Sequence, residues 1–218
     1  MGFFSDVGSA LSSAVSMVSN MVSSLGPLAE TAAKMLGVVG KYLGPVVQII
    51  QIVGMLLKVL MPEDDIEEMG AKAMEADKKP EDFDSNAEYI DYLRDEVQLD
   101  KEKFDKANDI EKAARTAVGA TIVAKGIGEQ KGFDIPLTAW VAMAKLNLSD
   151  KAEEVDKLLE TFKNGKLEDF AKYVDGKLDI KKEGEIGDDL VEMYKELEPN
   201  CSIEEIENRV MKMDTSGK

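Results

Sequence analysis

Apolar residues dominate the first 61 positions, and polar residues recur among them at spacings of three and four. Such spacings place residues on one face of an α-helix. The dipeptides Gly26-Pro27 and Gly44-Pro45 divide this stretch, because glycine can end one helix and proline can start the next. The pattern therefore predicts three helices, over residues 6–25, 28–43 and 46–61.

Each predicted helix has a thin polar edge and a wide apolar face. Surface helices of soluble proteins usually expose a broader face, and they do so with Lys and Glu rather than Ser. On insertion into a membrane, we expect these polar edges to line a water-filled pore while the apolar faces meet lipid. Their members are Ser12, Ser16, Ser19, Ser23, Lys34, Lys41, Gln48, Gln51 and Lys58.

The lengths of these helices bear on membrane spanning. At 1.5 Å per residue they extend over roughly 30, 24 and 24 Å. A bilayer has a hydrocarbon core roughly 30 Å thick, so the first helix just reaches across it and the others fall short. Length alone therefore makes none of them a convincing transmembrane helix.

The sharpest boundary in the chain is Met61-Pro62-Glu63, where the apolar stretch gives way to an acidic cluster. Residues 1–61 hold two acids and three bases, a net charge of +1, whereas residues 62–218 hold 41 acids and 24 bases, a net charge of −17. We therefore predict two units, an apolar region over 1–61 and an acidic helical domain over 62–218.

The acidic half contains further helical patterns and no long alternating run that would require a strand. Ser202 and Glu205 form a capping box that starts the last helix. The predicted fold is all-α, with an apolar N-terminal helical hairpin or three-helix segment and an acidic helical bundle. Its predicted helices are 64–77, 86–112, a buried 113–127, a buried 137–148, 150–163, 166–174, 186–197 and 202–213.

Composition excludes most catalytic chemistry. The chain has no histidine, one cysteine and a formal net charge of −16. We expect no catalytic site, no metal, no cofactor and no nucleic-acid partner. The acids around Cys201 should raise the pKa of its thiol, which favours an inert residue over a nucleophile.

Three interpretations of the apolar region remain open. It could insert into a lipid membrane, pack as an arm inside an oligomer or larger assembly, or form an ordinary core with an exposed polar edge. Small residues at four-residue steps, Gly8, Ser12 and Ser16 and also Gly40 and Gly44, suit close helix contacts in a membrane.

The Met1-Gly2-Phe3-Phe4 opening, the following helix rich in Ser, Ala, Gly and Val, and the apolar hairpin broken by Gly-Pro resemble small pore-forming effectors of contractile type VI secretion systems. Similar openings occur on phage DNA-ejection proteins. Colicin pore domains also hide an apolar hairpin, but near their C-terminus. The resemblance covers about 61 residues, is compositional, and transfers no catalytic residue.

The resemblance implies a protein without a signal peptide that is injected into a target cell, depolarises its membrane and is neutralised by an immunity protein. We expect a membrane-inserting pore former with lipid as its partner, a carrier or immunity protein, and a homo-oligomer in the membrane. Gly26, Pro27, Gly44 and Pro45 are the expected hinges. The alternative is a structural component of a virion or injection machine whose apolar arm packs in an oligomer.

Overall fold

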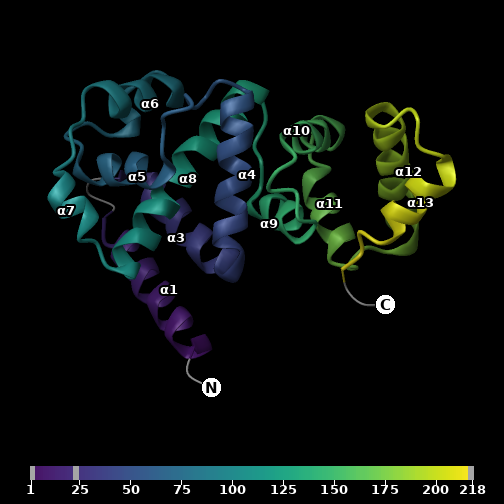
Figure 1. The fold of residues 1–218 in the computed structure, drawn as a ribbon, viewed down its shortest axis with the longest axis horizontal. Coiled ribbons are helices and arrows are strands. Elements are labelled where there is room, and N and C mark those ends of the chain that lie inside the picture. The colour runs from purple at the N-terminus through teal and green to yellow at the C-terminus, as the bar shows by residue number, and fades with distance from the viewer. Residues whose placement is uncertain (1–2, 22–24, 216–218) are drawn as a thin grey trace.

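The structure is a computed structural model that describes residues 3–21 and 25–215. All regular elements of the described residues are helices, which confirms the predicted all-α class. Figure 1 shows α1, α3, α5, α6, α7 and most of α8 on one side of α4 and α9 to α13 on the other. Helix α4 therefore stands between the two groups of helices.

Helix α8 (Asp109–Lys131) is the centre of the first group. It packs against α1 (Phe3–Ser19), α3 (Pro27–Val39), α4 (Leu43–Leu56), α5 (Ile66–Glu75) and α6 (Asn86–Asp95). Its middle is buried on almost every side because Ala, Gly and Val leave room for neighbouring helices on all faces. The predicted burial of 113–127 is confirmed, although that segment and the end of the predicted 86–112 helix form one helix.

Two glycines allow α5 and α8 to cross at backbone distance. A Cβ on Gly70 would lie 1.8 Å from the carbonyl oxygen of Arg115, and one on Gly119 would lie 1.9 Å from that of Ile66. No side chain fits at such distances, so both positions require glycine. This close crossing fixes α8 as the platform on which the apolar helices lie.

The apolar helices bend at a different place from the predicted one. Helix α3 starts at Pro27 after Gly26, as predicted, but it ends at Val39, and a 3₁₀ turn, η1 (Gly40–Tyr42), leads directly into α4. Gly40 takes φ 49° and ψ −120°, a backbone conformation that suits glycine alone. We call Gly40–Tyr42 the corner.

The predicted break at Gly44-Pro45 is wrong. Both residues lie in the first turn of α4. Proline fits there because the first four N–H groups of a helix have no acceptor within the helix. The same helix ends at Leu56 instead of Met61, since Lys58 adopts φ 60° and the N–H groups of Val59 and Leu60 donate back to Gly54 O.

The predicted helix 86–112 is also wrong as a single element. It divides into α6, a short α7 (Lys101–Asp105) and the start of α8, whose N-cap is Asn108. The 3₁₀ turn η2 (Pro80–Asp82) precedes α6. The side chains of Asp100 and Asn108 each accept backbone N–H donors at helix starts, so local capping ends one helix and begins the next.

The second group of helices follows the predicted order. It comprises α9 (Leu137–Lys145), α10 (Ala152–Thr161), α11 (Leu167–Val174), α12 (Ile180–Leu197) and α13 (Ile203–Met211). Ser202 and Glu205 form the predicted capping box. Helix α12 begins at Ile180 instead of 186, because Asp179 caps it by accepting the Lys182 N–H.

The boundary predicted at Pro62 marks the end of the apolar stretch, and helices from both sides of it share one hydrophobic core. Helices α3 and α4 contribute Leu36, Ile49 and Val53, and α8 contributes Val118 and Ile122. The acidic half of the chain thus supplies the surface that covers the apolar half.

Candidate membrane-active segment

The segment from Pro27 to Leu56 is the candidate membrane-active part of the chain; we call it the apolar segment. It covers α3, the corner and α4, and its mean hydropathy reaches 1.5 over the 18 residues that score highest. By length and composition alone it could cross a membrane, a test that the core helix of a soluble protein also passes.

The apolar faces of this segment point into the protein. Helix α4 buries Val46, Ile49, Ile50 and Val53, and it lies between α8 on one side and α9 and α10 on the other. Helix α3 packs on α1, α8 and α9. The residues that α3 buries are Leu28, Ala29, Ala32, Met35, Leu36 and Val39.

The polar edges face solvent, each on its own helix. Gln51 is half-buried, and Ser23 lies outside the described residues. The structure therefore places these edges on the outer surface and does not bring them together around one channel. The exposed members are Ser12, Ser16, Ser19, Lys34, Lys41, Gln48 and Lys58.

Part of the apolar surface stays exposed. The side chain of Val38 is 53% exposed, and those of Leu56 and Met61 are 43% and 44% exposed. Only a third of the most apolar 18-residue window is buried, whereas a helix in the core of a soluble protein is mostly buried. The apolar segment is thus incompletely covered.

The corner prevents the segment from spanning a bilayer in its present shape. Helices α3 and α4 contain 13 and 14 residues, which correspond to roughly 20 Å each. Neither length reaches across a hydrocarbon core of roughly 30 Å, whereas all 30 residues in one straight helix would extend over roughly 45 Å.

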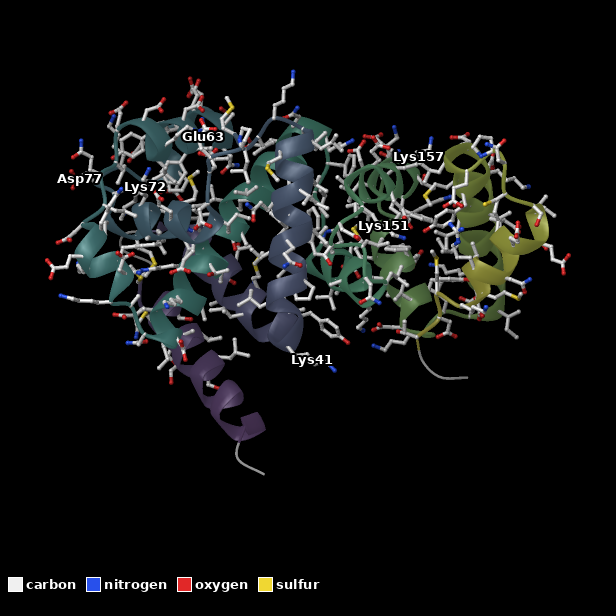
Figure 2. The ribbon with its side chains drawn as sticks, viewed as in Figure 1. Lys41, Glu63, Lys72, Asp77, Lys151 and Lys157 are labelled. Carbon is white, nitrogen blue, oxygen red and sulfur yellow. The ribbon has the colours of Figure 1, made fainter. Side chains whose placement is uncertain are left out.

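Cationic side chains gather near the corner. Lys41 Nζ lies 5.1 Å from the centre of the Tyr42 ring, and Lys145 Nζ of α9 lies 6.0 Å from the same ring. Figure 2 shows Lys41 pointing away from the body at the end of α4. Farther along α3, an exposed ion pair of 2.7 Å with Lys34 lowers the pKa of Glu30.

A buried ion pair that the sequence analysis missed follows the apolar segment. Arg94 of α6 donates from Nε to Asp64 Oδ1 at 3.0 Å and from Nη2 to Asp64 Oδ2 at 2.8 Å. The Asp64 side chain is only 6% exposed, and its hydrogen bonds raise the pKa of Arg94. The chain has three arginines among its 27 basic residues. Because arginine is the basic residue that suits buried ion pairs, each of the three was a candidate for such a pair.

The prediction for Cys201 is confirmed. Its Sγ donates to Glu198 Oε2 at 3.1 Å, and this hydrogen bond, burial and the charge of Glu198 raise the pKa of the thiol. Arg209, in turn, lowers the pKa of Glu198 to about 2. The thiol is therefore held protonated and is a poor nucleophile.

The comparisons with known proteins add no relative. No protein-family model matches the chain, no curated protein matches its sequence, and no solved structure matches its fold. Any function must therefore be inferred from the residues and their arrangement.

Proposed function

We propose that this protein inserts its apolar segment into a lipid membrane and permeabilises it. The single observation that carries the proposal is a run of 30 residues, apolar enough to span a bilayer, that is folded at a corner and incompletely covered by the acidic half. A chain that is soluble before it enters lipid must cover its apolar segment, because a fully exposed apolar surface of that size would aggregate.

Insertion would exchange contacts with α8, α9 and α10 for contacts with lipid. In the present fold the segment is held mainly by apolar contacts, which lipid tails can replace. Straightening at Gly40 would convert two short helices into one long enough to span. The hinges in this mechanism are Gly26 and Gly40, and the polar edges with Ser12, Ser16 and Gln48 would line water.

The resemblance to type VI effectors supplies the biological setting of the proposal. In that setting the chain leaves the producing cell by injection, and an immunity or carrier protein binds it until then. Lys34 and Lys41 are exposed cations of the polar edges of this segment, and their charges would influence which ions pass.

The first test is dye and ion leakage from liposomes with the full chain and two matched variants. Val38 and Gln48 are both exposed in the folded protein, so Val38→Glu and Gln48→Glu add the same charge without disturbing the core. A charged side chain at the centre of a membrane-spanning helix costs roughly 2.5–3.5 kcal/mol in a bilayer. We expect leakage from the wild type and Gln48→Glu and a loss of at least tenfold in Val38→Glu.

The outcome separates membrane entry from surface attachment. Equal leakage from the two variants would show that the exposed apolar side of α3 around Val38 does not enter lipid. A separate double variant, Ser12→Leu with Ser16→Leu, should keep membrane binding and lower single-channel conductance. Unchanged conductance would contradict the assignment of these serines to a water-filled lumen.

The second candidate function is an assembly component whose arm packs against other copies. The start of α1 projects from the body, beyond the other helices (Figure 1), and this observation favours the arm. This function predicts a discrete homo-oligomer in water without lipid. Sedimentation velocity on the full chain measures that directly, and an oligomer without any liposome leakage would favour the arm over the pore.

A further inference from the structure

A cavity of about 530 Å³ lies beside the apolar segment, where α3, α8, α9 and the loop between α8 and α9 meet. Its size falls within the range of roughly 300–1,000 Å³ that is usual for small-molecule sites. Met35 of α3, Ile135 of the loop and Leu137 of α9 supply apolar wall. The cavity is therefore large enough and apolar enough to hold the body of a small ligand.

Most polar groups of the cavity already have partners within the chain. Glu129 accepts the backbone N–H of Asn86 at 2.8 Å and its side-chain amide at 2.6 Å. The hydroxyl of Thr121 donates to Ala117 O at 2.8 Å, and that of Thr31 donates to Pro27 O at 3.3 Å. These groups have little hydrogen-bonding capacity left for a ligand.

Two lining groups that are buried or half-buried lack a partner among the described residues, and both are donors. Trp140 is fully buried, and its indole Nε1–H has no acceptor. Lys125 is half-buried and has no carboxylate partner in the described part of the chain. A buried donor without an acceptor costs about 1–3 kcal/mol, so a ligand that brings an acceptor to these two donors would remove that cost.

Comparison with other lysines shows how unusual Lys125 is. Lys72, Lys131 and Lys145 have side chains that are 14%, 9% and 23% exposed, and each is paired with a carboxylate. Among the half-buried lysines of the described residues, Lys79 and Lys125 have no carboxylate partner, and of these two Lys125 lines this cavity. The carboxylate of Asp134 also lines the cavity, but its residue is exposed to water, which screens its charge.

We infer that this cavity binds a small organic anion with an apolar body, of the class of medium-chain monocarboxylates. The carboxylate supplies the acceptors and the negative charge that Lys125 lacks, and the hydrocarbon chain packs along Met35, Ile135 and Leu137. Because Met35 belongs to α3 and Lys125 to α8, the ligand joins the apolar segment to its platform. The inference does not depend on membrane activity.

The test is a titration of the full chain with octanoate, below its micelle concentration, followed by tryptophan fluorescence. Trp140 is the single tryptophan of the chain and lies in the cavity wall, so its emission reports on this site. Octanol and octyltrimethylammonium are the matched probes that have the same tail without a negative charge. We expect a saturable change with octanoate and at least tenfold weaker binding of both other probes.

Variants assign the response to the cavity. Lys125→Met keeps the length of the side chain and removes its charge, and it should weaken octanoate binding at least tenfold. Lys112→Met removes an exposed lysine of the same helix and should leave the affinity unchanged. Ala124→Leu fills part of the cavity and should weaken all binding, whether or not Lys125→Met alters stability.

Three results would overturn the inference. They are no saturable response to octanoate, equal affinity for octanoate and octyltrimethylammonium, and unchanged octanoate affinity in Lys125→Met. A thermal melt of each variant by circular dichroism confirms that the comparison is between folded proteins. In the wild type, octanoate should raise the melting temperature, because the ligand binds the folded state alone.

Discussion

The apolar segment and the C-terminal helices both pack through apolar side chains, but they differ in their ion pairs. The segment buries Leu36, Ile49 and Val53 and, among the described residues, has no ion pair to another helix. Its polar contacts to other helices are a weak one, from the Thr121 hydroxyl to Met35 Sδ at 3.9 Å, and the approach of Lys145 to the Tyr42 ring.

The C-terminal helices pack through apolar side chains such as Phe170 and Leu190, and exposed ion pairs also link them. Lys166 of the loop before α11 pairs with Asp189 of α12 at 2.7 Å, and Lys182 of α12 pairs with Asp169 of α11 at 2.9 Å. Lys157 of α10, labelled in Figure 2, pairs with Glu196 of α12. Exposed pairs of this kind each contribute about 0–1 kcal/mol, so they add modestly to the apolar packing of these helices, whereas the apolar segment has no ion pair to another helix among the described residues.

This difference indicates which part of the protein can exchange its protein contacts for lipid contacts. Apolar contacts are non-directional, so lipid tails can replace a protein wall. Ion pairs are specific to their partners, so they preserve the arrangement of the C-terminal helices. We therefore expect the acidic C-terminal group to stay folded while the apolar segment moves.

The largest effect should come from Gly119→Ala, which breaks the platform under the apolar segment. The new Cβ would meet the Ile66 carbonyl oxygen at 1.9 Å, so α5 and α8 must separate. We expect a loss of about 3 kcal/mol in the free energy of unfolding, measured by urea denaturation. Gly184→Ala in α12, where nothing lies within 4 Å of the new Cβ, is the control and should be neutral or stabilising.

The next largest effect should come from Lys131→Met, which removes the cation that pairs α8 with α10. Lys131 of α8 holds Asp156 and Glu160 of α10 at 2.6 and 2.7 Å, and its side chain is only 9% exposed. Without it the two acids repel each other, and we expect a loss of about 1–3 kcal/mol. Hydrogen exchange should rise in α10, and a rise confined to α3 and α4 would contradict the assignment.

A smaller effect should come from Gly40→Ala at the corner. A side chain at φ 49° costs about 1–2 kcal/mol, so the bent segment becomes less favourable than a straight helix. We expect liposome leakage to become about 5–30 times faster. Gly37→Ala lies in α3 with open space around its Cβ and should not change the rate.

The two outcomes of this experiment have distinct meanings. If the wild type leaks and Gly40→Ala is no faster than Gly37→Ala, opening of the corner does not limit insertion. If no variant leaks, membrane activity itself is contradicted.

The smallest effect concerns pH and the C-terminal helices. Arg209 lowers the pKa of Glu198 from 4.5 to about 2, so this pair stabilises the fold fully above pH 4.5. The contribution is lost as the pH falls from 4.5 towards 2, because the unfolded chain then binds the proton more tightly. Acid should raise hydrogen exchange in α13 before α4, and Glu198→Gln should remove this pH dependence of α13.

Local residue types were enough to predict several elements. Pro27 starts α3, Ser202 and Glu205 cap α13, and the small apolar run from 113 to 127 is buried. The helix starts depend on neighbours within a few residues. The burial of 113–127 follows from its apolar composition, which favours removal from water. The exposed polar edges of α3 and α4 follow from helical spacing for the same reason.

Other features could not be read from the chain. The bend lies at Gly40 instead of Gly44-Pro45, since proline is accommodated in a first helical turn and glycine is needed where φ is positive. The pairing of Asp64 with Arg94 joins residues 30 positions apart, and the cavity beside Lys125 is formed by α3, by Asn86 of α6 and by the stretch from α8 to α9. Such contacts depend on how the helices cross.

The sequence by itself determined the all-helical class, the apolar character of the first 61 residues and the polar edge of each helix, because periodicity and composition are local properties. Only the tertiary structure decided what covers the apolar face, where the segment bends and that Lys125 lies in the wall of a cavity. Those outcomes depend on α8, which is drawn close to α5 by Gly70 and Gly119 and so provides the surface on which the apolar helices lie.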